Sequence, residues 1–275
     1  MDLDNGSNEI NHHHIPGLQE PLTKGHLAQA CKECAFQSLI YNAIANVCSH
    51  NQLPIDDVLL KIEDTVKKHV PQLKLILEQY GVKNFAVCVQ HRHFKVPDGF
   101  NMVGRVLFQG LFYFTRKVAN DKILGPGNVC GRKFIFDKQY GWRPCEFHEG
   151  SAPDLSKVAP EFFIVYTTYL VKHGLTSIFG LEYTVPGLLI FDILEIGLSD
   201  YGLLYVDTAS MPLNDAQIVT TRFGLSGPIH NNELKCIRFP EGHRKVNVDQ
   251  QESDPSDDEV IIAFKKEYPG AALSI

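Results

Sequence analysis

The spacing of apolar residues divides the 275-residue chain into a helical section and an extended section. Between residues 25 and 81, apolar positions recur every three or four residues, which is the period of an α-helix. The segment Leu27–Val47 is apolar nearly all round and predicts a buried helix. The segment Ile55–Val70 predicts an amphipathic helix that Pro71 interrupts. A short continuation is expected to end at Gly81, a residue suited to a left-handed C-terminal cap.

Beyond residue 82, short apolar runs separated by Gly, Pro, Asn and Asp predict strands. The predicted strands are Phe85–Phe94, Met102–Phe108, Leu111–Val118, Arg132–Phe136, Cys145–Glu149, Ser177–Thr184, Leu188–Gly197, Gly202–Asp207, Gln217–Phe223, Leu234–Phe239 and Arg244–Val248. One helix is expected among them at Pro160–His173, which begins with proline and is followed by Gly174. Because strands and helices do not alternate regularly, the pattern favours an α+β fold with N-terminal helices packed on a mainly antiparallel sheet.

The same pattern predicts one domain with flexible ends. We expect a single α+β domain over residues 25–248, with a helical section at 25–81 and a sheet-rich section at 82–248. Residues 1–24 lack periodicity and predict a disordered leader. Residues 249–259 carry six acidic side chains and no basic one, which is typical of a solvated acidic loop. In the C-terminal segment 260–275, the run Val260–Phe264 predicts an edge strand.

Composition and charge exclude several classes of partner. Hydrophobic residues make up 44% of the chain and charged residues 21%, as in ordinary globular proteins. The net charge of −6 comes from the acidic loop alone, since the rest of the chain has equal numbers of acidic and basic residues. The sequence has no basic patch of the kind that binds nucleic acid. It also has no apolar stretch that approaches the roughly 18 residues needed to span a membrane. The odd number of cysteines, seven, and a polar N-terminus favour reduced thiols in the cytoplasm or nucleus.

The candidate chemistry begins with two histidines after an apolar strand, His91 and His93. If that strand continues to residue 94, both side chains lie on one face and could bind one divalent metal ion. Half of the cupin pattern is present, because Asp98 follows at a similar distance, although cupins have glutamate there and a second motif that is missing here. His148 is the other candidate for a third ligand. The alternative that we favour is a histidine pair hydrogen-bonded at a sheet edge, with no cofactor.

Two further clusters invite a functional interpretation. Trp142 and Arg143 lie in a loop-like segment where stacking and hydrogen bonding could hold a ligand, as could Arg92 between the two histidines. A loop plug over the core is the favoured alternative for the tryptophan. The spacing of Cys31 and Cys34, with Cys48 and His50 further on, resembles that of zinc ligands. In a continuous helix, however, the fourteen residues between Cys34 and Cys48 span about 21 Å, which favours buried free thiols.

The order of several short motifs resembles an uncharacterised family of hypothetical proteins from filamentous fungi. The matching motifs are His91-Arg92-His93-Phe94 with Asp98-Gly99, then Pro153-Asp154-Leu155, then His173-Gly174-Leu175 with Leu181. The resemblance covers roughly residues 80–225 and implies a mixed α/β intracellular protein, with no activity to carry over.

The function that these observations favour is binding or accessory, toward a partner protein or a small molecule, rather than catalysis. The alternative is a metal-dependent enzyme that uses the His91 and His93 pair.

Overall fold

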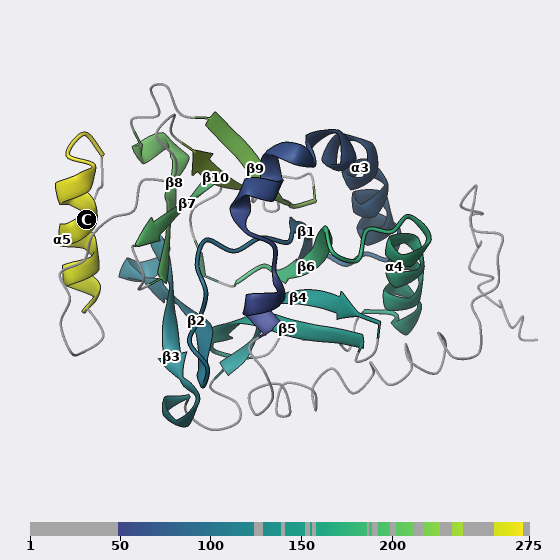
Figure 1. Ribbon diagram of the computed structural model, residues 1–275, viewed down its shortest axis with the longest axis horizontal. Coiled ribbons are helices and arrows are strands. Elements are labelled where there is room, and N and C mark those ends of the chain that lie inside the picture. Colours follow the sequence, from purple (N-terminus) through teal and green to yellow (C-terminus); the bar gives the residue numbers. More distant parts are fainter. Residues whose placement is uncertain are drawn as a thin grey trace, which may run out of the picture.

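Ten strands pair edge to edge in a closed barrel (Figure 1). The computed structural model describes residues 49–123, 129–138, 141–151, 155, 158–185, 187–188, 192–198, 202–211, 217–225, 233–238 and 256–271. The predicted leader, the predicted helix Leu27–Val47 and the predicted strand Arg244–Val248 lie outside the described residues.

The strands follow the barrel in the order β1-β6-β4-β5-β2-β3-β8-β7-β10-β9, and β9 pairs with β1 to close it. Their bounds are β1 Phe85–Val89, β2 Phe100–Leu107, β3 Phe112–Ala119, β4 Val129–Asp137, β5 Gly141–Glu149, β6 Phe179–Tyr183, β7 Asp192–Leu198, β8 Gly202–Asp207, β9 Gln217–Phe223 and β10 Glu233–Arg238. The pairs β2–β5 and β7–β10 are parallel and the other pairs are antiparallel. The barrel is therefore mixed.

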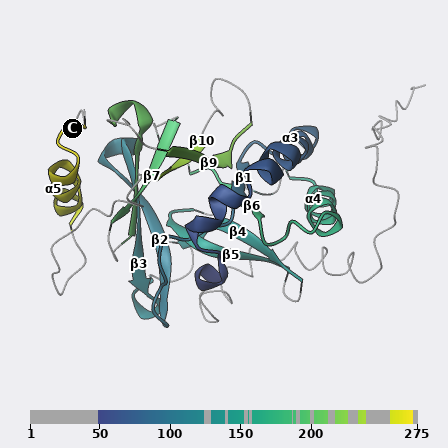
Figure 2. The same ribbon diagram turned by 45° about the horizontal axis from the view of Figure 1, so that its top comes forward.

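Three α-helices among the described residues cover the outside of the barrel on two sides (Figures 1 and 2). Helices α3 (Glu63–Gln79) and α4 (Pro160–Lys172) pack over β1 and β6, while α5 (Asp257–Glu267) packs over β7 and β8. None of the helices in the described part of the chain is long and apolar enough to cross a membrane.

Alternation along β6 sends apolar side chains outward to α3 and α4 and places a glycine and a glutamate inward. In β6, Phe179 and Leu181 join the core under α3 and α4, whereas Glu182 meets arginines from other strands inside the barrel. Gly180, which also faces inward, has no room for a side chain, because a Cβ there would lie 2.3 Å from the carbonyl oxygen of Phe134 in β4. The glycine thus permits the close β4–β6 pairing that closes this side of the barrel.

The predicted α+β arrangement, with N-terminal helices packed on a mainly antiparallel sheet, is wrong. Most strand segments are close to where the apolar runs place them, but they close on themselves instead of forming an open sheet. The pattern could not reveal this, because helices cover the outer face and side chains fill the inner face. Both faces of a strand are then buried, as in the unbroken burial of β1.

The helix predictions are partly confirmed. Helix α3 continues through Pro71 and stops before Gly81, whose φ of +62° is the predicted left-handed cap. Helix α4 begins at Pro160 as expected. The edge strand predicted at Val260–Phe264 is wrong, because these residues belong to α5. A capping box between Ser256 and Glu259 starts that helix inside the predicted acidic loop.

Candidate functional site

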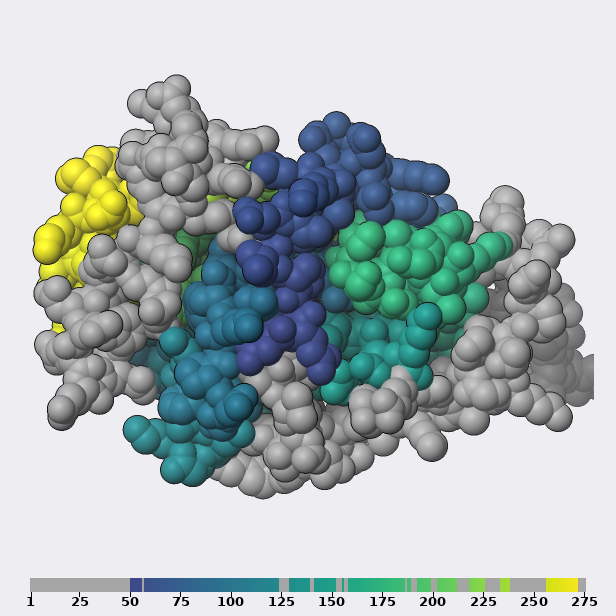
Figure 3. Space-filling view, viewed as in Figure 1, coloured from purple at the N-terminus to yellow at the C-terminus, as the bar shows by residue number. Residues whose placement is uncertain are grey.

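The two histidines lie on an irregular segment that follows β1. The strand ends at Val89, so the predicted extension to Phe94 is wrong. The segment is fixed instead by a neighbouring stretch of chain: the Arg92 backbone N–H donates to Pro54 O at 2.8 Å, and the Arg92 side chain donates to Leu53 O at 2.9 Å. Figure 3 shows that neighbouring stretch, in purple, on the surface between the teal strands and the green α4. Arg92, between the two histidines, therefore anchors the segment to Leu53 and Pro54 through two hydrogen bonds.

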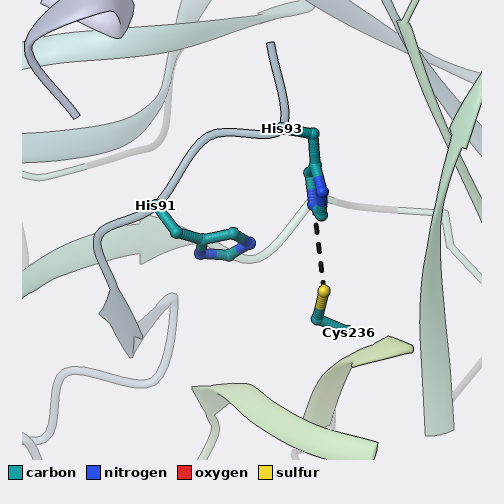
Figure 4. A group of neighbouring side chains, drawn as sticks. All are labelled: His91, His93 and Cys236. Carbon is teal, nitrogen blue, oxygen red and sulfur yellow. Dashed lines mark hydrogen bonds between the residues drawn. The ribbon is translucent and has the colours of Figure 1, made fainter. Parts of the chain in front are cut away.

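From this segment, both imidazoles converge on one carboxylate from β7, Glu195. Its Oε1 lies 2.7 Å from His93 Nε2 and 3.4 Å from His91 Nε2. The Cys236 thiol of β10 lies 4.0 Å from His93 Nε2, and the two rings and the thiol form one cluster (Figure 4). One potential ligand atom of each of His91, His93 and Cys236 lies within 4.8 Å of the others. All three side chains and Glu195 are almost completely shielded from solvent.

The other two predicted ligands do not belong to this cluster. Asp98 is exposed in the turn before β2. His148 lies on β5, where its Nδ1 is 3.3 Å from the Tyr113 hydroxyl. Burial, with Arg132 nearby, lowers the pKa of His148 to about 4, so this imidazole is neutral at physiological pH.

Glu195 connects the histidines to a network of buried charges inside the barrel. Glu182 of β6 accepts hydrogen bonds from Arg132 of β4 at 2.8 Å and from Arg222 of β9 at 2.9 Å. Burial opposes ionisation of Glu182, but Arg132 and Arg222 outweigh it and lower its pKa to about 2. This carboxylate is therefore ionised over the whole physiological pH range.

Lys133 joins the two halves of the network. Its Nζ lies 3.2 Å from Glu146 of β5 and 3.9 Å from Glu195. Burial opposes the charge on Lys133, but Glu146 and the other acidic groups outweigh it and hold the pKa well above its usual value. Burial likewise opposes the charge on Glu195, and Lys133 with the histidines holds its pKa well below the usual value. Lys133 therefore stays protonated and acts as a fixed positive charge.

A β-bulge explains how two successive residues of β4 reach the same interior. Adjacent strand residues normally point to opposite faces. The β4–β5 register shifts between Gly131 and Lys133, where β4 has one more residue than the paired part of β5, and it shifts again between Lys133 and Phe134. Arg132 and Lys133 both contact Glu146 inside the barrel as a result. Bulges of this kind often redirect side chains beside functional sites.

The Arg132 guanidinium packs against the rings of two tyrosines, which also contact each other with their ring centres 5.4 Å apart. The guanidinium carbon lies 4.3 Å from the ring centre of Tyr113 and 4.6 Å from that of Tyr205. The Tyr205 hydroxyl is buried and has no hydrogen-bond partner among the described residues. Burial and the charge of Glu195 raise its pKa to about 12, so it is a neutral phenol that can donate and accept.

Several other polar atoms of the network are buried without a hydrogen-bond partner in the described part of the chain. They are Glu146 Oε2, Glu182 Oε2, Glu195 Oε2 and Arg132 Nε. Such atoms are uncommon in folded proteins and indicate water, an ion or a ligand.

The remaining candidate residues lie elsewhere. Trp142 is buried in the core under α4, where its indole N–H donates to the Thr167 hydroxyl at 2.9 Å. Arg143 points to the other side of β5, toward Gln52 and Asp137. Neither residue is brought to the histidines.

Fold and site together define a closed mixed barrel with an ionised interior. No family model, curated protein or solved structure matches the chain. The resemblance to fungal hypothetical proteins therefore stays a prediction.

Sequence reasoning found the histidine pair but missed Glu195, Cys236 and the charge network. The available signal was a single glutamate between apolar residues within a strand, as in Phe-Gly-Leu-Glu182-Tyr and Asp-Ile-Leu-Glu195-Ile. In an open sheet such a residue faces water, whereas in a closed barrel it faces the interior.

Proposed function

We propose that this protein binds a small polar molecule inside its barrel, in contact with the charge network. The observation that carries the proposal is the set of buried charges on strands that surround one interior, several of whose polar atoms lack a hydrogen-bond partner in the described part of the chain. Three acidic residues (Glu146, Glu182 and Glu195) and three basic residues (Arg132, Lys133 and Arg222) make it up, each at most 7% exposed in its side chain.

Stability alone is a poor explanation for this network. Removing an ion from water costs several kcal/mol, and replacing buried ion pairs by apolar residues is often neutral or stabilising. A barrel of this size could be filled with Leu, Ile and Val, as the outer core is. Retention of six charges in the interior therefore supports a role in binding.

The unpartnered atoms indicate the chemistry of the ligand. Three carboxylate oxygens and the Tyr205 hydroxyl can accept hydrogen bonds, whereas Arg132 Nε is a donor. The network as a whole carries no net charge when its acids and bases are ionised and its histidines neutral. A small molecule rich in hydroxyl or amino donors, such as a polyol or a diamine, fits this balance.

Thermal unfolding of the full chain with defined probes tests the proposal. The probes are glycerol, erythritol and ribitol as polyols, and ethylenediamine and putrescine as diamines. At a ligand concentration 100 times Kd, binding stabilises a folded protein by about 2.7 kcal/mol. We expect at least one probe class to raise Tm in wild type.

Tyr205→Phe and Tyr113→Phe form a matched pair for this test. Both rings contact Arg132, but the Tyr113 hydroxyl has a protein partner, His148, and the Tyr205 hydroxyl has none among the described residues. Tyr205→Phe should therefore reduce the shift in Tm, and Tyr113→Phe should retain it. General stabilisation by polyols, which are excluded from protein surfaces, would raise Tm equally in all three proteins and would contradict the proposal.

A metal-dependent enzyme is the second candidate function. One observation favours it: His91 and His93 converge on Glu195 with Cys236 beside them. A metal-dependent activity would first require that these residues bind a metal ion, which measurement of the metal content of the purified chain tests.

We also propose that the protein acts in the cytoplasm or nucleus, without nucleic acid or membrane as a partner. The support is that three cysteines in the described residues, Cys88, Cys130 and Cys145, are free thiols. The balanced charge outside the acidic loop supports the absence of a nucleic-acid partner.

A further inference from the structure

His91 is oriented as a metal ligand is. Its Nδ1 lies 3.0 Å from the carbonyl oxygen of Val89, which can only accept, so Nδ1 carries the proton. In the neutral ring, Nε2 then presents a lone pair. Metal-binding histidines are usually held in this way, with the second nitrogen donating to a carbonyl or carboxylate.

His91 Nε2 faces the carboxylate of Glu195. Nε2 is buried without a hydrogen-bond partner among the described residues, and Glu195 Oε1 lies 3.4 Å away. A metal cation next to both atoms would be attracted to the carboxylate and could be bound by the ring nitrogen. The His91 side chain is only 2% exposed, so this position is shielded from bulk solvent.

A second imidazole and a thiol complete a set of ligands around the same point. His93 Nε2 lies 2.7 Å from the same Glu195 oxygen and 4.0 Å from Cys236 Sγ. With zinc–nitrogen and zinc–sulfur bonds of about 2.0–2.3 Å, ligand atoms of a tetrahedral site lie roughly 3.3–3.6 Å apart. The ligand atoms of His91, His93 and Cys236 lie within 4.8 Å of one another, so movements of less than about 1 Å would bring these three to such distances.

We propose that His91, His93 and Cys236 bind one Zn²⁺ ion, with the Glu195 carboxylate as the fourth ligand. Two imidazoles and a thiolate are ligands that zinc prefers, whereas Mg²⁺ and Ca²⁺ prefer oxygen. Binding releases the thiol proton of Cys236 to solvent, and the proton between His93 Nε2 and Glu195 moves to Nδ1 of the His93 ring, which stays neutral. The divalent ion, the thiolate and the carboxylate are then electrically neutral together, as a buried site requires.

The zinc site shares Glu195 with the charge network, but the two proposals have separate tests. The zinc site also needs the segment after β1 and Cys236, whereas the polar ligand depends on the Tyr205 hydroxyl and the network around Arg132. Either can fail while the other stands, because zinc binding is measured by metal content and the ligand by the Tyr205→Phe comparison.

Metal content and the spectrum of the Co²⁺-loaded full chain test the zinc proposal. We expect one equivalent of Zn²⁺ after exposure to excess metal and extensive dialysis, measured by atomic emission. We expect the Co²⁺-loaded chain to show a thiolate-to-cobalt charge-transfer band and the intense visible bands of a tetrahedral ion. A wild-type chain that binds neither ion would overturn the proposal without any variant.

Variants assign the site to these residues. Cys236→Ser and His93→Ala should each weaken Zn²⁺ binding by more than about tenfold, and Cys236→Ser should remove the charge-transfer band. Cys145→Ser is the matched control, because it is another buried strand thiol. The double variant Cys31→Ser/Cys34→Ser should also retain the ion. Loss of the charge-transfer band in that double variant, with its retention in Cys236→Ser, would show that zinc binds elsewhere.

Discussion

Replacing Glu182 with glutamine should strongly destabilise the barrel. The side chain keeps its size but loses the charge that Arg132 and Arg222 share at 2.8 and 2.9 Å. Two buried guanidinium groups would then lack their common counter-charge. Removing one partner of a buried ion pair typically costs about 3–5 kcal/mol, because the remaining charge stays buried and uncompensated.

The pKa of Glu182 gives an independent magnitude. Its value of about 2, against 4.5 for an ordinary glutamate, corresponds to about 3 kcal/mol of stability. Because the folded-state pKa is lowered, this contribution is complete above pH 4.5 and is lost as the pH falls toward 2. The difference between wild type and Glu182→Gln should therefore be largest at neutral pH and shrink in acid.

Urea unfolding of both proteins at neutral pH and at several acidic values measures the effect. Glu63→Gln is the control, because Glu63 forms an exposed ion pair with Lys67 on α3 and its loss should leave the unfolding curve unchanged. If Glu182→Gln stays within about 1 kcal/mol of wild type at neutral pH, or if the difference does not depend on pH, the network does not hold its charges as argued.

Two further predictions test the closure of the barrel and the burial of its histidines. Gly180→Ala should destabilise the fold or prevent folding, because the added Cβ would lie 2.3 Å from a backbone oxygen of β4. Gly197→Ala is the control and should be nearly neutral, because no atom lies within 4 Å of its added Cβ. Circular dichroism and thermal unfolding compare the two variants. His148, with its pKa lowered to about 4, should make stability fall as the pH decreases from 6.5 toward 4, because the unfolded chain binds the proton first. Urea unfolding of His148→Gln should show a smaller fall, and an unchanged pH slope would count against a buried neutral imidazole.

Local structure could be predicted from the sequence where local chemistry decides it. The apolar runs mark most of the strands, and Pro160 and Gly81 mark the start of α4 and the cap of α3. The prediction of a strand at Val260–Phe264 is wrong because these apolar residues suit a strand as well as a buried helix face. The capping box beginning at Ser256 was the signal for a helix.

Barrel closure could not be predicted in the same way. The contact that closes the barrel joins β1 to β9, whose paired residues Cys88 and Arg222 are far apart in the sequence. No local period records such a pairing. In an open sheet a polar residue within a strand usually faces solvent, whereas in the closed barrel Glu182 and Glu195 face the interior. The sequence pattern alone does not distinguish the two cases.

Only the part of the candidate site that is local in the sequence could be predicted. His91 and His93 are neighbours in the chain, and their pairing as possible ligands needs no fold. Glu195 and Cys236 come from β7 and β10, which are neighbouring strands in the barrel wall because they pair in parallel. Asp98 is a candidate because of its distance from His93 in the sequence, and His148 is one only if folding brings it close. The structure places neither residue beside the histidine pair.

Native mass spectrometry of the freshly purified full chain tests most directly whether the interior of the barrel is a binding site. Wild type and Tyr113→Phe should carry the additional mass of a small organic molecule that a metal chelator does not remove, and Tyr205→Phe should carry little or none. Bare chain masses for all three proteins, or the same adduct on all three, would contradict a ligand held at the Tyr205 hydroxyl and the charge network.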